Sequence, residues 1–215
     1  MDLKLIAKAL AASEPKTRSE GFIRMRSYLT SLASAEQLPH VWKSLFYCNF
    51  YSDLWMADKL HLETVQELES LYSVTQFDSF LWFRSFLEMM RNEWEGLDPV
   101  RIDKYMLLVR YMLRTILINA IKDTKAWTGL LSDFIEKSVY KAQSLLFHVA
   151  DIYLEELPES EFKVKIKMIL PFIRLMKTTR INHLADMVYS KIILKLVGEN
   201  DERLAKWLFK HATSE

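Results

Sequence analysis

Apolar residues recur at helical spacing along almost the whole chain of 215 residues. The pattern is interrupted at short segments in which Ser, Asp, Pro or Gly occur. The predicted breaks fall at residues 13–16, 34–39, 51–58, 73–76, 95–99, 123–125, 157–160 and 198–201. We therefore predict roughly nine to eleven helices, joined by connections of the usual helix-to-helix length.

Two of these breaks also carry signals for the start of the following helix. Asp98 can accept a hydrogen bond from an unpaired backbone amide as an N-cap, and Pro99 suits the first helical position because it lacks an amide hydrogen. A long helix is predicted from there to about Ile121. Ser160 is predicted to cap a later helix, in which Pro171 predicts a kink.

The order of the predicted elements indicates the fold class. Helix follows helix with short connections and no strand-like segment, which favours an all-α fold of stacked antiparallel helical hairpins, a HEAT-like solenoid. A compact irregular helical bundle is the alternative, because no sequence motif repeats at a fixed period. The predicted organisation is a single all-helical domain over residues 1–215.

Composition supports a helical chain with a real core and limits how it could bind nucleic acid. Half of the residues are hydrophobic, and only 4 Gly and 5 Pro occur. The formal net charge is +1, so any contact with RNA must come from a local basic patch. The apolar stretches are interrupted by Arg110, Arg114 and Arg174, which predicts no membrane span. One cysteine and early charges lead us to expect a reducing, intracellular compartment.

The residue types that carry most enzyme chemistry are isolated in this sequence. No histidine pairs with another histidine or with Cys48 at metal-ligand spacing; the five are His40, His61, His148, His183 and His211. Cys48 lies in an apolar helix and is expected to be a small buried hydrophobe. The acids around residues 155–161 are predicted to form a solvated acidic surface. We therefore expect no catalytic site, no metal and no cofactor.

One predicted helix, between Ser160 and Thr178, carries a local basic patch. At ~100° per residue its cations fall within an arc of roughly 80°, and its apolar residues occupy the opposite side. The candidate RNA-contact residues are Lys163, Lys167, Arg174 and Lys177. The apolar residues are Met168, Ile169, Phe172, Leu175 and Met176. The alternative is a solvated face of lysines and arginine with no ligand.

Residues 80–110, FLWFRSFLEMMRNEWEGLDPVRIDKYMLLVR, resemble the signature of the eukaryotic ribosomal RNA-processing protein 1 family. In that signature an Arg-Glu-Trp, a Gly-hydrophobic-Asp turn and an Arg-x-Asp-Lys-aromatic helix follow one another. The corresponding residues are Arg91, Glu93, Trp94, Gly96, Leu97, Asp98, Arg101, Asp103, Lys104 and Tyr105. Asn92 interrupts the first group. Three further blocks keep the family's order: KTRSEGFIRMRSYL, VWKSLFYCNFYSD, and LLFHVADIYLEEL followed by ILPFIRLM.

The resemblance implies a nucleolar, non-catalytic factor that is needed for processing precursor ribosomal RNA in early large (60S) subunit biogenesis. It implies a scaffold whose partners are other assembly factors, ribosomal proteins and precursor ribosomal RNA, with no membrane and no small-molecule substrate. The residues alone leave a second class open, a general helical-repeat adaptor that binds a protein peptide and has no RNA role.

The signature residues have two possible roles that the sequence leaves open. They can form a network that fixes the turn between two hairpins, or they can contact a partner. The residues concerned are Arg91, Glu93, Trp94, Asp98, Arg101, Asp103 and Lys104. The large aromatic residues at helical spacing are expected in the core rather than on a base-stacking surface; they are Trp42, Phe46, Trp82, Phe86 and Trp94.

We predict that the chain is helical and folds cooperatively without metal, because its predicted helices are capped and its histidines are scattered. Circular dichroism with and without a chelator measures both properties. We expect a predominantly helical spectrum and the same melting curve in both conditions. A large sheet signal, or melting caused by the chelator, would contradict this prediction.

Overall fold

The computed structural model describes residues 2–31, 34–51, 66–74, 79–198, 203, 206, 207 and 210. All regular elements among these residues are helical, which confirms the predicted all-α class. None of the described helices is both long enough and apolar enough to span a membrane. The chain forms two compact units, Met1–Met112 and Leu113–Glu215. A single domain over residues 1–215 stays a prediction.

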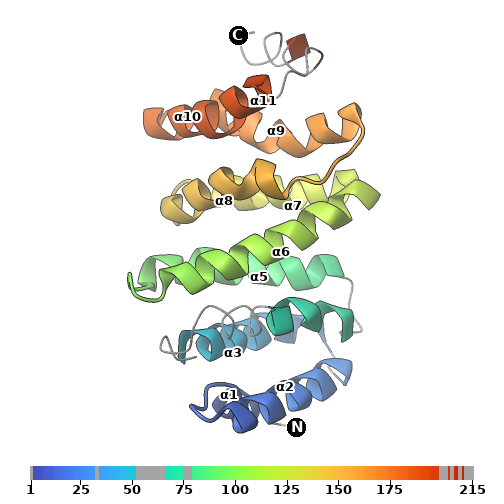
Figure 1. The fold of residues 1–215 in the computed structure, drawn as a ribbon, viewed down its shortest axis with the longest axis vertical. Coiled ribbons are helices and arrows are strands. Elements are labelled where there is room, and N and C mark those ends of the chain that lie inside the picture. Colours follow the sequence, from blue (N-terminus) through green and yellow to red (C-terminus); the bar gives the residue numbers. More distant parts are fainter. Residues whose placement is uncertain are drawn as a thin grey trace. The chain divides into compact units, whose positions relative to one another are not determined.

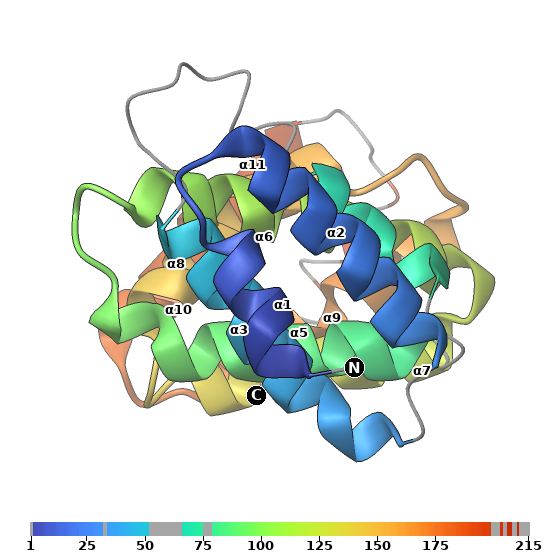
Figure 2. The ribbon, with the colours of Figure 1, turned by 90° about the horizontal axis from the view of Figure 1, so that it is seen from below.

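The first unit is built from helices that pack on their neighbours in sequence and on the helix two places further on. Its elements are α1 (Leu3–Leu10), α2 (Pro15–Thr30), η1 (Ala35–Gln37), α3 (Leu38–Tyr51), η2 (Leu71–Val74), α5 (Ser79–Glu93), η3 (Trp94–Gly96) and the first half of α6 (Ile102–Lys122). Helix α1 packs against α2 and also against α3, which in turn packs against α5 (Figure 1). Figure 2 shows α1 and α2 side by side.

The second unit follows the same rule. After the second half of α6 come α7 (Thr124–Ser138), α8 (Gln143–Glu156), α9 (Phe162–Thr178), α10 (Asn182–Val188), the π-helical η4 (Tyr189–Ile193) and α11 (Leu194–Gly198). Helix α7 packs on both α8 and α9, while α8 packs on α10 and η4. Contacts between consecutive helices and between helices two apart are those of stacked hairpins, so the predicted solenoid-like arrangement is confirmed within each unit.

Two helix ends were not predicted, because the apolar pattern continues through them. Between α7 and α8, Val139 and Ala142 are both buried, and the Gln143 side chain donates to the Val139 carbonyl over 2.7 Å. Between α9 and α10, the Thr179 hydroxyl accepts a hydrogen bond from the Ile181 amide at 3.2 Å. In both places a side chain bonds to the backbone and satisfies groups that the helix end leaves unpaired.

The Asp98 side chain accepts a backbone hydrogen bond as predicted, but it caps a turn that precedes the helix, and the predicted role of Pro99 is wrong. The Asp98 carboxylate accepts a hydrogen bond from the Arg101 amide at 3.0 Å. Helix α6 begins only at Ile102, whose amide donates to the Asp98 carbonyl over 3.2 Å. Pro99 therefore lies in the turn before the helix. Helix α6 ends at Lys122, close to the predicted end.

The predicted cap at Ser160 is also wrong. Helix α9 begins after Glu161, and no side chain caps its first turn. The Ser160 hydroxyl is buried and has no hydrogen-bond partner among the described residues. Pro171 lies inside α9, which continues to Thr178, and the kink at Pro171 stays a prediction.

The predicted aromatic core is confirmed in the first unit. Trp42, Trp82 and Phe86 are fully buried, and the ring centroid of Trp42 lies 4.4 Å from that of Trp82 and 5.0 Å from that of Phe86. The Trp42 indole N–H donates to the Trp82 backbone carbonyl over 3.0 Å, which joins α3 to α5. Phe46 and Trp94 are buried as well. These rings are core residues and are not available for base stacking.

Two helical glycines form a matched pair for testing the packing. A Cβ at Gly21 in α2 would lie 2.9 Å from the backbone nitrogen of Leu10 in α1, whereas a Cβ at Gly129 in α7 would meet nothing within 4 Å. Gly129→Ala should raise the free energy of unfolding by ~1 kcal/mol through helix propensity. Gly21→Ala should lower it by ~1–3 kcal/mol, because backbone of α1 must move.

Thermal and urea denaturation followed by circular dichroism measures both variants. Gly129→Ala is the control for helix propensity in this chain. An equal increase in stability for both variants would show that α1 and α2 do not approach as closely as described.

Candidate nucleic-acid interface

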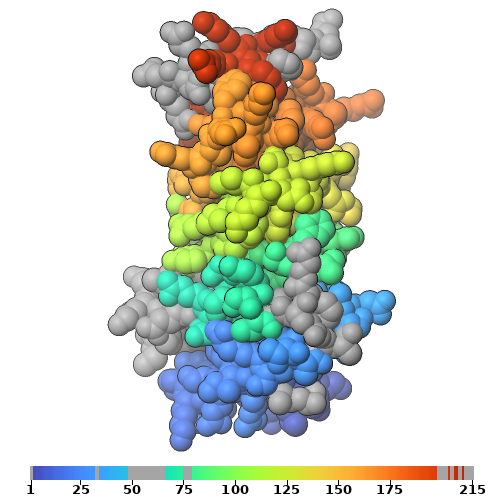
Figure 3. All heavy atoms as spheres, turned by 90° about the vertical axis from the view of Figure 1, so that its right-hand side faces the viewer, coloured from blue at the N-terminus to red at the C-terminus, as the bar shows by residue number. Residues whose placement is uncertain are grey.

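The four cations predicted to contact RNA lie together on one face of α9. Lys163, Lys167, Arg174 and Lys177 are all exposed, and we call this set the basic stripe. The opposite face of α9 is buried in the core through Met168, Ile169, Phe172 and Leu175. Figure 3 shows side chains of the orange segment, which includes α9, projecting from the surface. The predicted amphipathic geometry is therefore confirmed, whereas its role in binding RNA stays a prediction.

Three members of the basic stripe are not neutralised by nearby acids. Among the described residues, no carboxylate forms an ion pair with Lys163, Lys167 or Arg174. In contrast, Lys137 is paired with Asp133 at 2.7 Å within α7. Unpaired exposed cations on one helix face produce a local positive potential even though the chain is almost neutral overall.

Tyr153 of α8 holds the backbone of α9 in place through a hydrogen bond and a ring contact. The Tyr153 hydroxyl donates to the Met168 carbonyl over 2.6 Å, one turn before Pro171. Its ring packs edge-on against Phe172, with the ring centroids 4.8 Å apart. Burial raises the pKa of the Tyr153 phenol above its usual range, so this group stays a neutral hydrogen-bond donor. The helix that carries the basic stripe is therefore held in place by its packing on α8.

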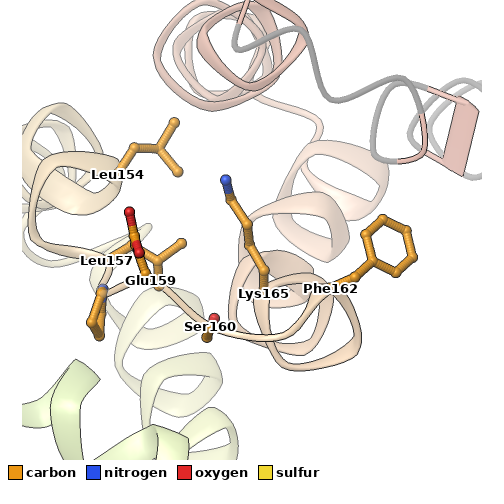
Figure 4. Close-up of a pocket in the computed structure, with 7 residues that line it drawn as sticks. Leu154, Leu157, Glu159, Ser160, Phe162 and Lys165 are labelled. Atoms are coloured by element: carbon orange, nitrogen blue, oxygen red, sulfur yellow. The ribbon is translucent and has the colours of Figure 1, made fainter.

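A hollow of about 470 Å³ lies beside the start of α9. Its lining residues are Leu154, Leu157, Pro158, Glu159, Ser160, Phe162 and Lys165 (Figure 4). Lys165 is two residues from both Lys163 and Lys167, and it is therefore rotated by about 160° around the helix from each. The hollow and the basic stripe are consequently on different sides of α9.

The residues of the family signature surround the turn between α5 and α6. Glu93, at the end of α5, forms an ion pair with Lys43 of α3 at 3.4 Å. Arg101 forms an ion pair with Asp98, the residue whose carboxylate also caps the turn. These contacts join α3, α5 and the start of α6.

The signature residues also differ in how deeply their side chains are buried. Trp94 and Lys104 are buried, with 3% and 4% of their surface exposed. The neighbouring Tyr105 is fully buried, and its hydroxyl donates to the Phe46 carbonyl of α3 over 2.7 Å. Arg91 is partly exposed, and Asp103 alone among the seven predicted residues is exposed. The contacts favour a structural role for the buried members, and partner binding by Arg91 or Asp103 stays a prediction.

One ion pair between a buried acid and a partly exposed arginine was missed, because the acid was predicted to lie on a solvated surface. The side chain of Glu156 is only 2% exposed, and it accepts two hydrogen bonds from the Arg114 guanidinium at 2.5 and 3.2 Å. The sequence held a signal for this burial. Glu156 continues the apolar spacing of Val149, Ile152 and Tyr153 on α8.

The histidines stay apart in the described structure. Nowhere in that part of the chain do three or more His, Cys, Asp or Glu residues form a group that could hold a metal ion. His183 hydrogen-bonds the Gln143 side chain at 3.0 Å and stacks on Phe147. His61, His211 and the side chain of Cys48 lie outside the described residues.

Comparison with known proteins identifies relatives over the whole chain. The sequence model of the family described as "Nucleolar protein, Nop52" matches residues 1–215. Ribosomal RNA processing protein 1 homolog B from Mus musculus is 28% identical over 90% of this chain and 29% of its own length. Homolog A from Homo sapiens is 26% identical over 87% of this chain, and the match covers 46% of that protein. The chain thus spans less than half the length of these relatives.

If the basic stripe binds RNA, reversing all four cations to Glu should weaken that binding and leave the fold intact. Exposed charges contribute little to stability, so the helical signal should not change. Each lost phosphate contact should remove ~0.7–0.9 from the slope of log affinity against log salt concentration. Titration of ribosomal RNA at several salt concentrations measures the slope.

The matched control reverses four other exposed lysines, Lys4, Lys8, Lys122 and Lys125, and changes the net charge equally. We expect this control to bind nearly as the unmodified chain does. An unchanged slope in the folded stripe variant would show that the basic stripe is only a solvated face.

Proposed function

The chain belongs to the Nop52 family of nucleolar proteins, and on this basis we propose that it is a non-catalytic factor needed for processing precursor ribosomal RNA. The match of the family over all 215 residues carries the proposal. Relatives named ribosomal RNA processing protein 1 homologs support it. The finer part of the proposal is that the chain acts in early large (60S) subunit biogenesis, as a scaffold between assembly factors, ribosomal proteins and ribosomal RNA.

A scaffold of this kind needs a rigid body with chemically distinct surfaces. Within each of the two units, the packed helical hairpins supply this rigidity, because their side chains interlock and cannot adapt freely. The basic stripe supplies a surface for phosphates, while partly exposed Arg91 and exposed Asp103 supply polar groups beside the signature turn. The non-catalytic part of the proposal rests on the isolated positions of the histidines and the single cysteine in the sequence.

Sedimentation distinguishes this scaffold from a general peptide adaptor. A scaffold co-sediments with precursors of the large subunit in a sucrose gradient of nuclear extract. A peptide adaptor without an RNA role stays in the light fractions. The stripe variant and its matched control can be followed in the same gradient.

Depleting the protein should cause precursors of the large-subunit RNA to accumulate, while the small-subunit RNA matures nearly normally. The reason is that a scaffold of the large-subunit precursor is needed only on that branch of processing. Pulse labelling of ribosomal RNA measures both branches. Equal loss of both subunits, or no effect, would count against the assignment to the large subunit.

A further inference from the structure

Helix α9 itself places no aromatic side chain within the arc of the basic stripe. Helix α9 is described in full and contains two aromatic residues, Phe162 and Phe172. Phe172 is buried against Tyr153, and Phe162 lines the hollow at the start of the helix (Figure 4). Proteins that hold unpaired strands stack successive bases on exposed aromatic rings. The basic stripe can contact phosphates, but α9 offers unpaired bases no ring of its own beside these cations.

The cations form two pairs along the helix axis. Lys163 and Lys167 make the first pair, and Arg174 and Lys177 make the second. At 1.5 Å per residue, the centres of the two pairs are about 16 Å apart. Half-buried Leu170 is on the same side of α9 between them. Two separated charge clusters with an apolar residue between them fit two sugar-phosphate backbones on either side of a groove.

The distance between the two pairs is fixed before any ligand binds. The segment between them contains Pro171, through which α9 continues, and Met168, whose carbonyl is held by Tyr153. A preformed spacing lowers the entropy lost on binding. It favours a ligand with a regular shape of its own over a flexible strand.

From these three features we infer that the basic stripe binds double-stranded RNA across its minor groove, through phosphates and sugars and without reading the base sequence. The minor groove of an RNA duplex is wide and shallow, and it exposes the ribose hydroxyls to a protein surface. A convex helix face with cations near both ends can lie across such a groove. This inference rests on the proposed function, and it names the form of RNA that the basic stripe recognises.

Fluorescence anisotropy with the full chain tests the inference. The probes are two RNA duplexes of about 20 base pairs with unrelated sequences, and a poly(U) strand with the same number of phosphates. We expect both duplexes to bind with the same affinity and at least ~10-fold more tightly than poly(U). Tighter binding of poly(U), equal binding of all three probes, or a preference for one duplex would overturn the inference.

Paired substitutions locate the contact. Lys163→Gln with Lys167→Gln, and Arg174→Gln with Lys177→Gln, should each weaken duplex binding about fivefold or more, because each pair contacts one backbone. The control pair, Lys122→Gln with Lys125→Gln, removes the same charge from exposed positions outside the basic stripe and should change affinity less than twofold. Equal loss in all three variants would show that the basic stripe is not the binding site.

The gradient experiment keeps the two proposals separate. A chain that co-sediments with large-subunit precursors but prefers poly(U) overturns the duplex inference and leaves the proposed function standing. A chain that prefers duplex RNA in solution but stays in the light fractions overturns the proposed function.

Discussion

Within each unit, the described helices bury apolar faces against the helix beside them or the helix two places further on, and the other features depend on that packing. Helix α3 lies against both α1 and α5, and α7 lies against both α8 and α9. No single helix of this length would be stable alone in water, because most helical stability in proteins comes from burial of an amphipathic face. The stacked hairpins therefore fold together within each unit.

Close packing removes polar groups from water. In three places the polar atom of an aromatic side chain is paired with the backbone of another helix. The Trp42 indole, the Tyr105 hydroxyl and the Tyr153 hydroxyl each donate to a backbone carbonyl of another helix. Each of these three rings contributes apolar area while its own polar atom is satisfied. The buried indole N–H of Trp82, in contrast, has no hydrogen-bond partner among the described residues. The Arg114–Glu156 pair meets the same need for a buried carboxylate. These bonds fix the register between neighbouring helices.

The family signature and the candidate RNA surface belong to different units of the chain. The signature belongs to the first unit, where Trp94 and Lys104 are buried and Glu93 is paired with Lys43. A conspicuous sequence motif can therefore mark a structural turn rather than a contact with a partner. The basic stripe belongs to the second unit and is wholly exposed. Its side chains contribute little to the core, and Lys163, Lys167 and Arg174 form no ion pair with a described carboxylate.

The sequence by itself determined the helical class, most helix boundaries, the aromatic core and the amphipathic face that carries the basic stripe. These features follow from spacing along one helix, which is set by the helical repeat alone. Only the structure decided the start of α6 at Ile102, the start of α9 at Phe162, the end of α7 at Ser138, and the burial of Glu156. The burial of Glu156 depends on atoms from another part of the chain, because the Arg114 guanidinium pairs with its carboxylate. A local pattern does not specify which distant group will lie beside a side chain, and that neighbour determines whether a polar group is exposed, capped or buried.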